Sequence, residues 1–227
     1  MDIHLKRVFN GKYNVNVIAN DEYIGPTISR GYEWDGWMRT DIQKYYKKGT
    51  DILDIGANIG YNSLMFSDYG PVHSFEPVFY DIVNMNIRAN ALNHTVSVYP
   101  IALSNEDTES VIYIPERGFQ SDPNIINYGA ASMYKSDDIG GTPFETTTKK
   151  LDSIYEGHPS VMKIDVEGHE LQVLKGALKT IKKYMPVIMV EILKFEGNPI
   201  YDLLLSLGYD EPIERHEKVY VFEPKPI

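Results

Sequence analysis

The stretch DILDIGANIG at residues 51–60 constrains the fold of this chain more than any other part of the sequence. A short apolar run carries one acid, Asp54, and then breaks into a turn that contains Gly56 and Gly60. An amphipathic stretch, Tyr61–Ser67, follows directly. Strand, glycine turn and helix in this order are typical of the entrance to a nucleotide-type pocket in an open α/β sheet. The dinucleotide fingerprint G-x-G-x-x-G is absent, which disfavours a NAD-dependent oxidoreductase.

The overall composition fits a single soluble globular domain. Of the 227 residues, 43% are hydrophobic and 24% are charged, and a chain of this length can bury a large core. The formal net charge of −10 disfavours a nucleic-acid backbone or an anionic membrane as the main partner, because both attract basic surfaces. The absence of cysteine excludes disulfides, thiolate metal sites and a cysteine nucleophile. Because of the negative charge, we expect no nucleic-acid partner.

The first residues, MDIHLKRVFNGKYN, are too polar for a secretory signal peptide. No stretch of the sequence is both apolar enough and long enough to span a bilayer. We therefore expect a cytoplasmic location without membrane insertion, and we interpret the glycosylation sequon at Asn93–Thr95 as a chance match. The sequence leaves the oligomeric state open.

Strand and helix patterns alternate along the chain and predict an α/β fold with a doubly wound, mostly parallel sheet. The predicted strands are Asp51–Ile55, Pro71–Glu76, Val96–Ile101, Val111–Ile114, Val161–Asp165 and Pro186–Ile192. Besides the helix after the glycine turn, the predicted helices are Asp35–Lys48, Tyr80–Leu92, Glu170–Tyr184 and a segment capped by Asn198. The runs Tyr209–Ile213 and Lys218–Phe222 are close enough to pair as a hairpin, so we expect an antiparallel final strand.

We expect two parts in the chain. Residues 1–48 are predicted to form an N-terminal extension that packs on or covers the site, and residues 49–227 to form the main domain. At the entry of the helix predicted for residues 35–48, Trp34 and Trp37 serve either as a hydrophobic anchor or as part of a pocket lid.

A long segment without periodicity, residues 117–148, is rich in Gly, Ser, Asp, Asn and Pro. We predict a loop that either covers the substrate or forms a flexible insertion. Its candidate lining residues are Tyr128, Ser132 and Tyr134.

Two further strand ends carry residues that suit a nucleoside ligand. Glu76 ends its predicted strand 22 residues after Asp54, and an acid at this position can accept both hydroxyl groups of a ribose. The segment Ile101–Leu103, with Ala102 at its centre, ends the next strand and can sandwich an adenine between apolar side chains. The alternative for Glu76 is a surface glutamate at the end of a strand, and the alternative for Ile101–Leu103 is plain core packing.

The segment KIDVEGHELQVLKG concentrates ionisable groups where a buried strand ends. Asp165, Glu167, His169 and Glu170 lie within six residues, a pattern that indicates an active site at the carboxyl end of a strand. Glu170 can instead cap the following helix, and His169 can be an exposed residue of its first turn.

Four motifs in this order and spacing resemble the FkbM-type methyltransferase family. They are DILDIGANIG, FEP at Phe75–Pro77, KIDVEGHELQVLKGA at Lys163–Ala177 and VIMVEI at Val187–Ile192. The resemblance extends over residues 49–192 and implies a class I, Rossmann-like fold that binds S-adenosyl-L-methionine (SAM). It also implies O-methylation, often of sugars or of natural products that carry them.

The resemblance assigns roles residue by residue. The cofactor motif matches Asp54, Gly56, Asn58 and Gly60, and the ribose acid matches Glu76. Asp165, Glu167 and Gly168 match the family signature, in which His169 falls at a variable position. The predicted cofactor-binding residues are therefore Asp54, Gly56, Asn58, Gly60, Glu76 and Ala102.

Two routes can activate an acceptor hydroxyl for methyl transfer. His169 or Asp165 can act as general base, with Glu167 as the third catalytic candidate. Alternatively, Asp165 and Glu191, at the ends of adjacent strands, can hold Mg²⁺ or Mn²⁺. We predict a SAM-dependent O-methyltransferase that acts on a carbohydrate or glycan hydroxyl. The alternatives are another small acceptor, such as a polyketide or lipid-linked molecule, and a non-catalytic SAM-binding protein.

Overall fold

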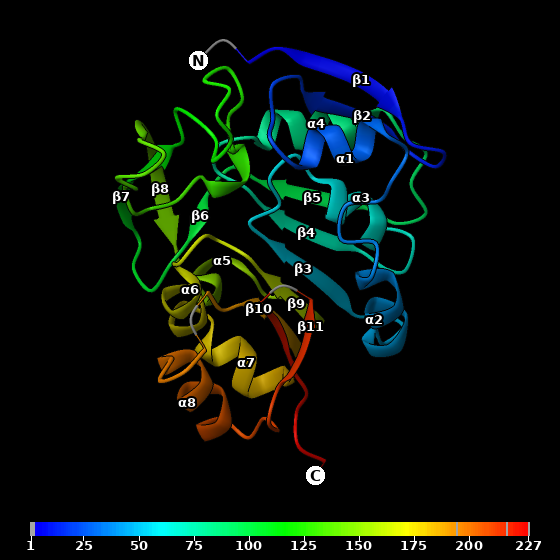
Figure 1. The fold of residues 1–227 in the computed structure, drawn as a ribbon. Helices are drawn as coiled ribbons and strands as arrows, with labels where there is room; N and C mark the ends of the chain where they lie inside the picture. Colours follow the sequence, from blue (N-terminus) through cyan, green and yellow to red (C-terminus); the bar gives the residue numbers. More distant parts are fainter. Residues whose placement is uncertain (1–2, 194, 217, 227) are drawn as a thin grey trace.

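The computed structural model describes residues 3–193, 195–216 and 218–226, and a central sheet with helices on both faces dominates it (Figure 1). Within these residues, seven strands form the sheet in the order β11-β12-β10-β9-β3-β4-β5. Their bounds are β3 Asp51–Ile55, β4 Val72–Phe75, β5 Val96–Tyr99, β9 Pro159–Ile164, β10 Val187–Glu191, β11 Ile213–His216 and β12 Val219–Phe222. Neighbouring strands are parallel, except that β12 is antiparallel to both β10 and β11. The predicted doubly wound sheet with an antiparallel final strand is confirmed.

Helices cover the two faces of the sheet through separate apolar clusters. One cluster joins the sheet to α5 Leu151–Ile154, α6 Glu170–Gly176, α7 Leu178–Tyr184 and α8 Pro199–Ser206. The other face packs against α2 Met38–Tyr45 and α3 Tyr61–Phe66. Side chains alternate between the two faces along each strand, so the face of α2 and α3 also receives Asp54, Lys163 and Glu191. Sheet alternation thus gathers charged groups on one face.

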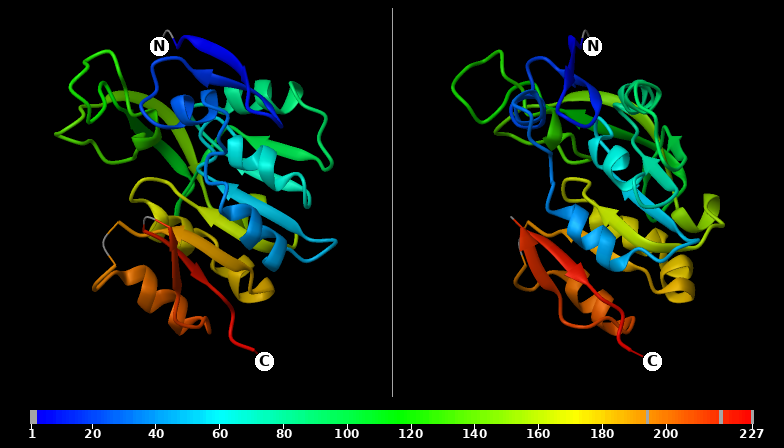
Figure 2. Two further views of the ribbon diagram at one scale, coloured as in Figure 1. Left: turned by 45° about the vertical axis from the view of Figure 1, so that its right-hand side comes forward. Right: turned by 90° about the vertical axis from the view of Figure 1, so that its right-hand side faces the viewer.

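The amino-terminal segment forms a hairpin that the sequence reading missed. Strands β1 Leu5–Phe9 and β2 Asn14–Ile18 pair antiparallel, and an apolar cluster joins β2 to α1 Ile24–Ser29 and to α4 Tyr80–Arg88. The hairpin lies at the end of the molecule away from the carboxyl terminus (Figure 2). The division into residues 1–48 and 49–227 stays a prediction.

The segment predicted as a loop, residues 117–148, is corrected at its end. Strand β8 Thr142–Lys149 pairs antiparallel with β7 Thr108–Ile114 and parallel with β6 Ala102–Leu103, which makes a second, three-stranded sheet in the described part of the chain. The residues of β8 are TPFETTTK, and most of them are at least partly exposed. A polar strand of this kind is defined by its partner rather than by an apolar run, which is why the sequence pattern did not reveal it.

Two other element predictions are wrong in detail. The predicted strand Tyr209–Ile213 is replaced by β11 at Ile213–His216, whose exposed residues are recruited by pairing with β12. The predicted helix Glu170–Tyr184 divides into α6 and α7, because the carboxylate of Asp152 accepts hydrogen bonds from the backbone nitrogens of Lys179 and Thr180 and starts a new helix there.

The cap predicted at Asn198 is confirmed, since its side chain accepts a hydrogen bond from the nitrogen of Ile200 at 2.9 Å. Among the described helices, none is long and apolar enough to cross a membrane.

Candidate functional site

A cleft opens at the carboxyl ends of β3, β4 and β9. The chain proceeds outward from β3 to β4 and β5 on one side and from β9 to β10 on the other, and α/β sheets commonly bind ligands at such a switch point. Its walls are the glycine loop Gly56–Ile59, the segment Phe75–Phe79, the segment Ile101–Leu103 and the turn after β9. Most of the lining residues have apolar side chains, and Glu76 and Asp165 are among the charged ones. We name it the first cleft.

Glycine is required at two positions of the loop that enters this cleft. Gly56 has a φ of +78°, and a Cβ there would lie 1.8 Å from the carbonyl oxygen of Asp165. Gly60 has a φ of +81°, and a Cβ there would lie 2.7 Å from a methyl group of Val83. The loop therefore turns sharply beneath the turn after β9. Gly56 and Asn58 line the first cleft, whereas Gly60 lies at the start of α3 behind it.

Glu76 connects two walls of the first cleft. Its Oε2 accepts a hydrogen bond from the backbone nitrogen of Asn58 at 2.9 Å, and its Oε1 accepts from the nitrogens of Val78 and Phe79 at 2.7 and 2.9 Å. Burial raises the pKa of Glu76 to about 6, against the opposing effect of these backbone donors. A carboxylate offers about four lone-pair sites, so Glu76 keeps acceptor capacity toward a ligand hydroxyl.

His169 lies at the side of the first cleft formed by Ile101–Leu103. Its Nε2 is 2.9 Å from the hydroxyl of Ser104, and its Nδ1 is 3.2 Å from the hydroxyl of Tyr134. Burial lowers the pKa of His169. Both ring nitrogens thus have hydroxyl partners, and the imidazole is held as a neutral group beside Ala102, which lines the same wall.

The segment before β8 forms a further wall of the first cleft. Its alternate residues Gly129, Ala131 and Met133 line the cleft, whereas the predicted lining residues Tyr128, Ser132 and Tyr134 support it from behind. The hydroxyl of Ser132 donates a hydrogen bond to the carbonyl oxygen of Glu167 at 2.6 Å. Tyr128 is buried and packs edge-on against Phe79.

A second cleft joins the first at the end of β9. Both clefts are lined by Trp34, Lys163, Asp165 and Glu167. The second cleft continues over residues 33–38 to Met189, Glu191, His216 and Val219. Trp37 stacks on His216 there, with ring centroids 5.9 Å apart. The two tryptophans therefore belong to a cleft wall as well as to the packing of the segment before α2.

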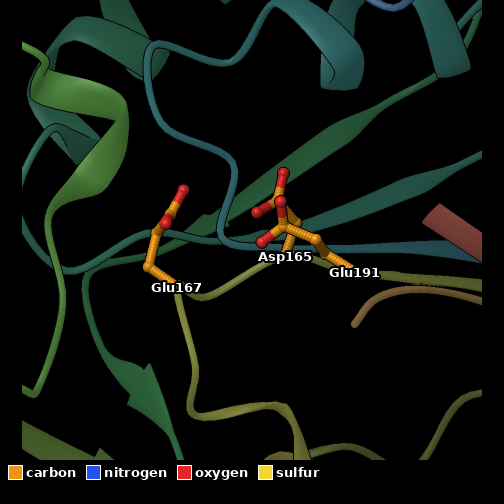
Figure 3. Close-up of side chains that lie close together, drawn as sticks. All are labelled: Asp165, Glu167 and Glu191. Carbon is orange, nitrogen blue, oxygen red and sulfur yellow. The ribbon is translucent and has the colours of Figure 1, made fainter. Parts of the chain in front are cut away.

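Three carboxylates converge where the clefts meet (Figure 3). One carboxylate oxygen from each of Asp165, Glu167 and Glu191 lies within 4.8 Å of the others. Burial, followed by the charges of Asp165 and Glu191, raises the pKa of Glu167 to about 9. Burial, followed by the charge of Asp165, raises the pKa of Glu191 to about 7. Such a group can share a proton or hold a divalent cation, and both Asp165 and Glu191 belong to the metal set predicted from the sequence.

Glu170 holds the turn that carries Glu167. Its Oε1 accepts hydrogen bonds from the backbone nitrogens of Val166 and Gly168 at 3.1 and 3.0 Å. Glu167 itself has a φ of +54°, a conformation that costs a non-glycine residue free energy and that a fixed turn can maintain. Glu170 therefore braces the turn before α6 and does not cap this helix, which begins without a side-chain cap hydrogen bond.

Lys163 is a site residue that the sequence reading missed. Its Nζ donates a hydrogen bond to the carbonyl oxygen of Gly56 at 2.8 Å and lies 3.3 Å from Asp165 and 3.6 Å from Asp54. Burial opposes its charge, but these carboxylates outweigh burial and raise the pKa of Lys163. The available signal was a lysine inside an otherwise buried strand, because such a cation needs a partner.

Asp54 lies in the core beneath the glycine loop. Its carboxylate accepts a hydrogen bond from Ser63, faces Lys163, and lines neither cleft. The structure therefore places it behind the loop, where it supports the loop through Lys163.

Comparison with known proteins gives consistent matches. Residues 54–211 match the model of the methyltransferase FkbM domain. The hexuronic acid methyltransferase AglP of Haloferax volcanii is 28% identical over 151 residues, which are 63% of this chain and 56% of that protein. The chain thus spans little more than half the length of this relative.

A solved structure shares the fold. The methyltransferase FkbM from Methylobacillus flagellatus KT superposes with a TM-score of 0.51 at 14% identity, over 80% of this chain and 47% of that one. At this identity the likeness concerns the fold alone. With the domain match over most of its length, the chain belongs to the FkbM methyltransferase family.

Proposed function

We propose that this protein is a SAM-dependent O-methyltransferase whose acceptor is a carbohydrate or glycan hydroxyl. One observation carries the proposal: the first cleft, suited to a nucleoside, opens directly into a second cleft at Asp165 and Glu167. Methyl transfer requires a donor and an acceptor to meet in line, and two joined clefts provide this arrangement. The relative AglP is named for methylation of a hexuronic acid, which supports a sugar acceptor.

The residues of the first cleft fit SAM. The glycine loop presents backbone close to the cleft, Glu76 keeps acceptor capacity for one ribose hydroxyl, and the wall around Ala102 offers apolar contact for an adenine. When bound, the cofactor supplies an activated methyl group on a sulfonium. We assign Gly56, Asn58, Glu76 and Ala102 to contact with it, and Asp54 and Gly60 to the support of the loop.

The carboxylate of Asp165 at the junction can accept the proton of an acceptor hydroxyl, whereas the raised pKa of Glu167 keeps a proton on that group near neutral pH. Asp165 and Glu167 line both clefts, whereas His169 lies along the first cleft only. A general base must reach the hydroxyl it deprotonates, so Asp165 is better placed than the imidazole. Alternatively, Asp165, Glu167 and Glu191 would hold Mg²⁺ or Mn²⁺, which would acidify a nearby hydroxyl.

Labelled methyl transfer tests the proposal. Purified protein is titrated calorimetrically with SAM and with its demethylated product, and is then incubated with labelled SAM and a panel of glycosides, lipid-linked sugars and phenols. We expect binding of both ligands and transfer to sugars. Absence of cofactor binding would refute the proposal, and binding without transfer to any acceptor would indicate the non-catalytic alternative. Full transfer in EDTA would exclude the metal route.

A further inference from the structure

The second cleft combines aromatic walls with a strong excess of negative charge. Its described lining contains the tryptophans Trp34 and Trp37. Its described acidic residues are Glu33, Asp35, Asp165, Glu167 and Glu191, and its described lysine is Lys163. Aromatic faces suit the apolar side of a sugar ring, whereas the charges determine which ring substituents are tolerated.

The cations near the second cleft are already engaged. Lys163 is buried between Asp165 and Asp54 and bonds to the carbonyl oxygen of Gly56. Arg39 pairs with Glu33 at 2.6 Å and with Asp68 at 2.7 Å. Neither the ammonium group of Lys163 nor the guanidinium group of Arg39 is therefore free to pair with an anionic ligand.

Two further cations lie outside the lining. Arg215 forms hydrogen bonds to both carboxylate oxygens of Asp41. Lys218 directly precedes β12 and does not line the second cleft, and its charge only partly opposes the burial and carboxylate repulsion that raise the pKa of Glu191. His216, which does line it, is stacked on Trp37.

The carboxylates retain unsatisfied acceptor capacity. Oε2 of Glu191 is buried and has no hydrogen-bond partner among the described residues. With five acidic residues against one lysine in the described lining, a ligand cation or hydroxyl donor is favoured there and another anion is repelled.

We propose that the second cleft selects its acceptor by charge: affinity rises from a uronate through a neutral glycoside to a glycoside that carries an ammonium group. This inference rests on the proposed function, because it treats the second cleft as the acceptor site. It separates this protein from the relative named for a hexuronic acid, since the described lining offers no unpaired cation for a uronate carboxylate.

The tryptophans provide a direct readout of this cleft. The chain has two tryptophans, and both line the second cleft. Trp37 does not line the first cleft, so the Trp34→Phe variant leaves a reporter for the second cleft alone. Its fluorescence is followed in protein saturated with S-adenosylhomocysteine, in EDTA, during titration with three matched methyl glucosides. These carry a primary hydroxyl, an ammonium group or a carboxylate at the same carbon.

We expect the uronate to bind at least about tenfold more weakly than the neutral glucoside, which corresponds to about 1.4 kcal/mol. The ammonium analogue should bind more tightly than the neutral one. Any other order of affinities, or no response to any of the three sugars, would overturn the inference. Saturation by S-adenosylhomocysteine, measured separately by calorimetry, shows whether the cofactor half of the proposed function holds in either case.

A charge-neutral variant sharpens the test. Glu191→Gln should reduce the discrimination against the uronate, because it removes one carboxylate from the cleft wall. Glu109→Gln, an exposed residue on β7, is the matched control and should leave the order and the ratios unchanged. Equal discrimination in Glu191→Gln and the parent would contradict selection by charge. Repetition with Mg²⁺ identifies metal bridging: recovery of uronate binding only with the ion would also overturn the inference.

Discussion

The side-chain nitrogen of Lys163 lies 3.3 Å from the carboxylate of Asp165 at the carboxyl end of β9. The same nitrogen bonds to the carbonyl oxygen of Gly56 in the glycine loop. One buried cation thus joins the glycine loop to the acidic turn, and it compensates Asp54 as well.

Loss of this cation should destabilise the whole domain. We expect Lys163→Met to lower the free energy of unfolding by about 3–5 kcal/mol, because the buried Asp54 is left without a compensating charge. Urea denaturation followed by circular dichroism measures the change. Lys182→Met, on the exposed side of α7, is the control and should change stability by less than about 0.5 kcal/mol. Equal stability of the two variants would contradict the role assigned to Lys163.

A side chain at Gly56 should disrupt the junction of β3 and β9. The Cβ of Gly56→Ala would meet the backbone of Asp165 at 1.8 Å, and the backbone there has a φ of +78°. We expect a loss of at least about 3 kcal/mol, since strain and a backbone clash add together. Gly11→Ala shares the positive φ but has no atom within 4 Å of the new Cβ, so it should lose only the conformational part. Thermal melting of both variants distinguishes the two contributions.

Removal of the Glu76 carboxylate should weaken cofactor binding. We expect Glu76→Ala to raise the Kd for S-adenosylhomocysteine at least about tenfold, because a ligand hydroxyl and the loop nitrogen of Asn58 lose their acceptor. Calorimetry on protein whose folding has been verified by its melting curve measures the effect. Glu109→Ala should bind like the parent. An unchanged Kd in Glu76→Ala would rule out the ribose assignment.

The acidic junction should make stability depend on pH. The folded pKa values of Glu167 and Glu191, about 9 and about 7, lie above the ordinary value of 4.5, so the folded state retains protons that the unfolded chain releases. Stability is therefore greatest at low pH with respect to these groups, and it declines as the pH rises through 7 and then 9.

Comparison with a neutral variant isolates this contribution. Between pH 6 and 9, we expect the parent to lose at least about 1 kcal/mol more stability than Glu167→Gln, which has no proton to release. Urea denaturation at several pH values gives the two curves. Parallel curves would mean that Glu167 titrates normally.

His169 should affect cofactor affinity more than the chemical step. Its ring lies along the first cleft between Ser104 and Tyr134 and does not line the second cleft. We expect His169→Ala to raise KM for SAM while kcat changes by less than about threefold. A general base would instead contribute roughly 10²–10⁴-fold to kcat. A loss of kcat in that range, with KM unchanged, would restore His169 as the base.

The core strands were predictable because buried parallel strands leave continuous apolar runs, as in β9 and β10. The convergence of Asp165 and Glu191 was also predictable, because adjacent parallel strands have their carboxyl ends at the same edge of the sheet. The walls of the second cleft were not, because Trp37 and His216 meet only through tertiary packing. Strand β8 was missed because its polar residues depend on β7 for their conformation.

The hydrogen bond from Ser132 to the backbone of Glu167 connects the insertion before β8 to the acidic turn. A replacement of this insertion that lacks a hydroxyl at position 132 would leave the turn of Glu167 without this hydrogen bond. An exchange of the insertion should therefore keep that hydroxyl or carry the turn along with it.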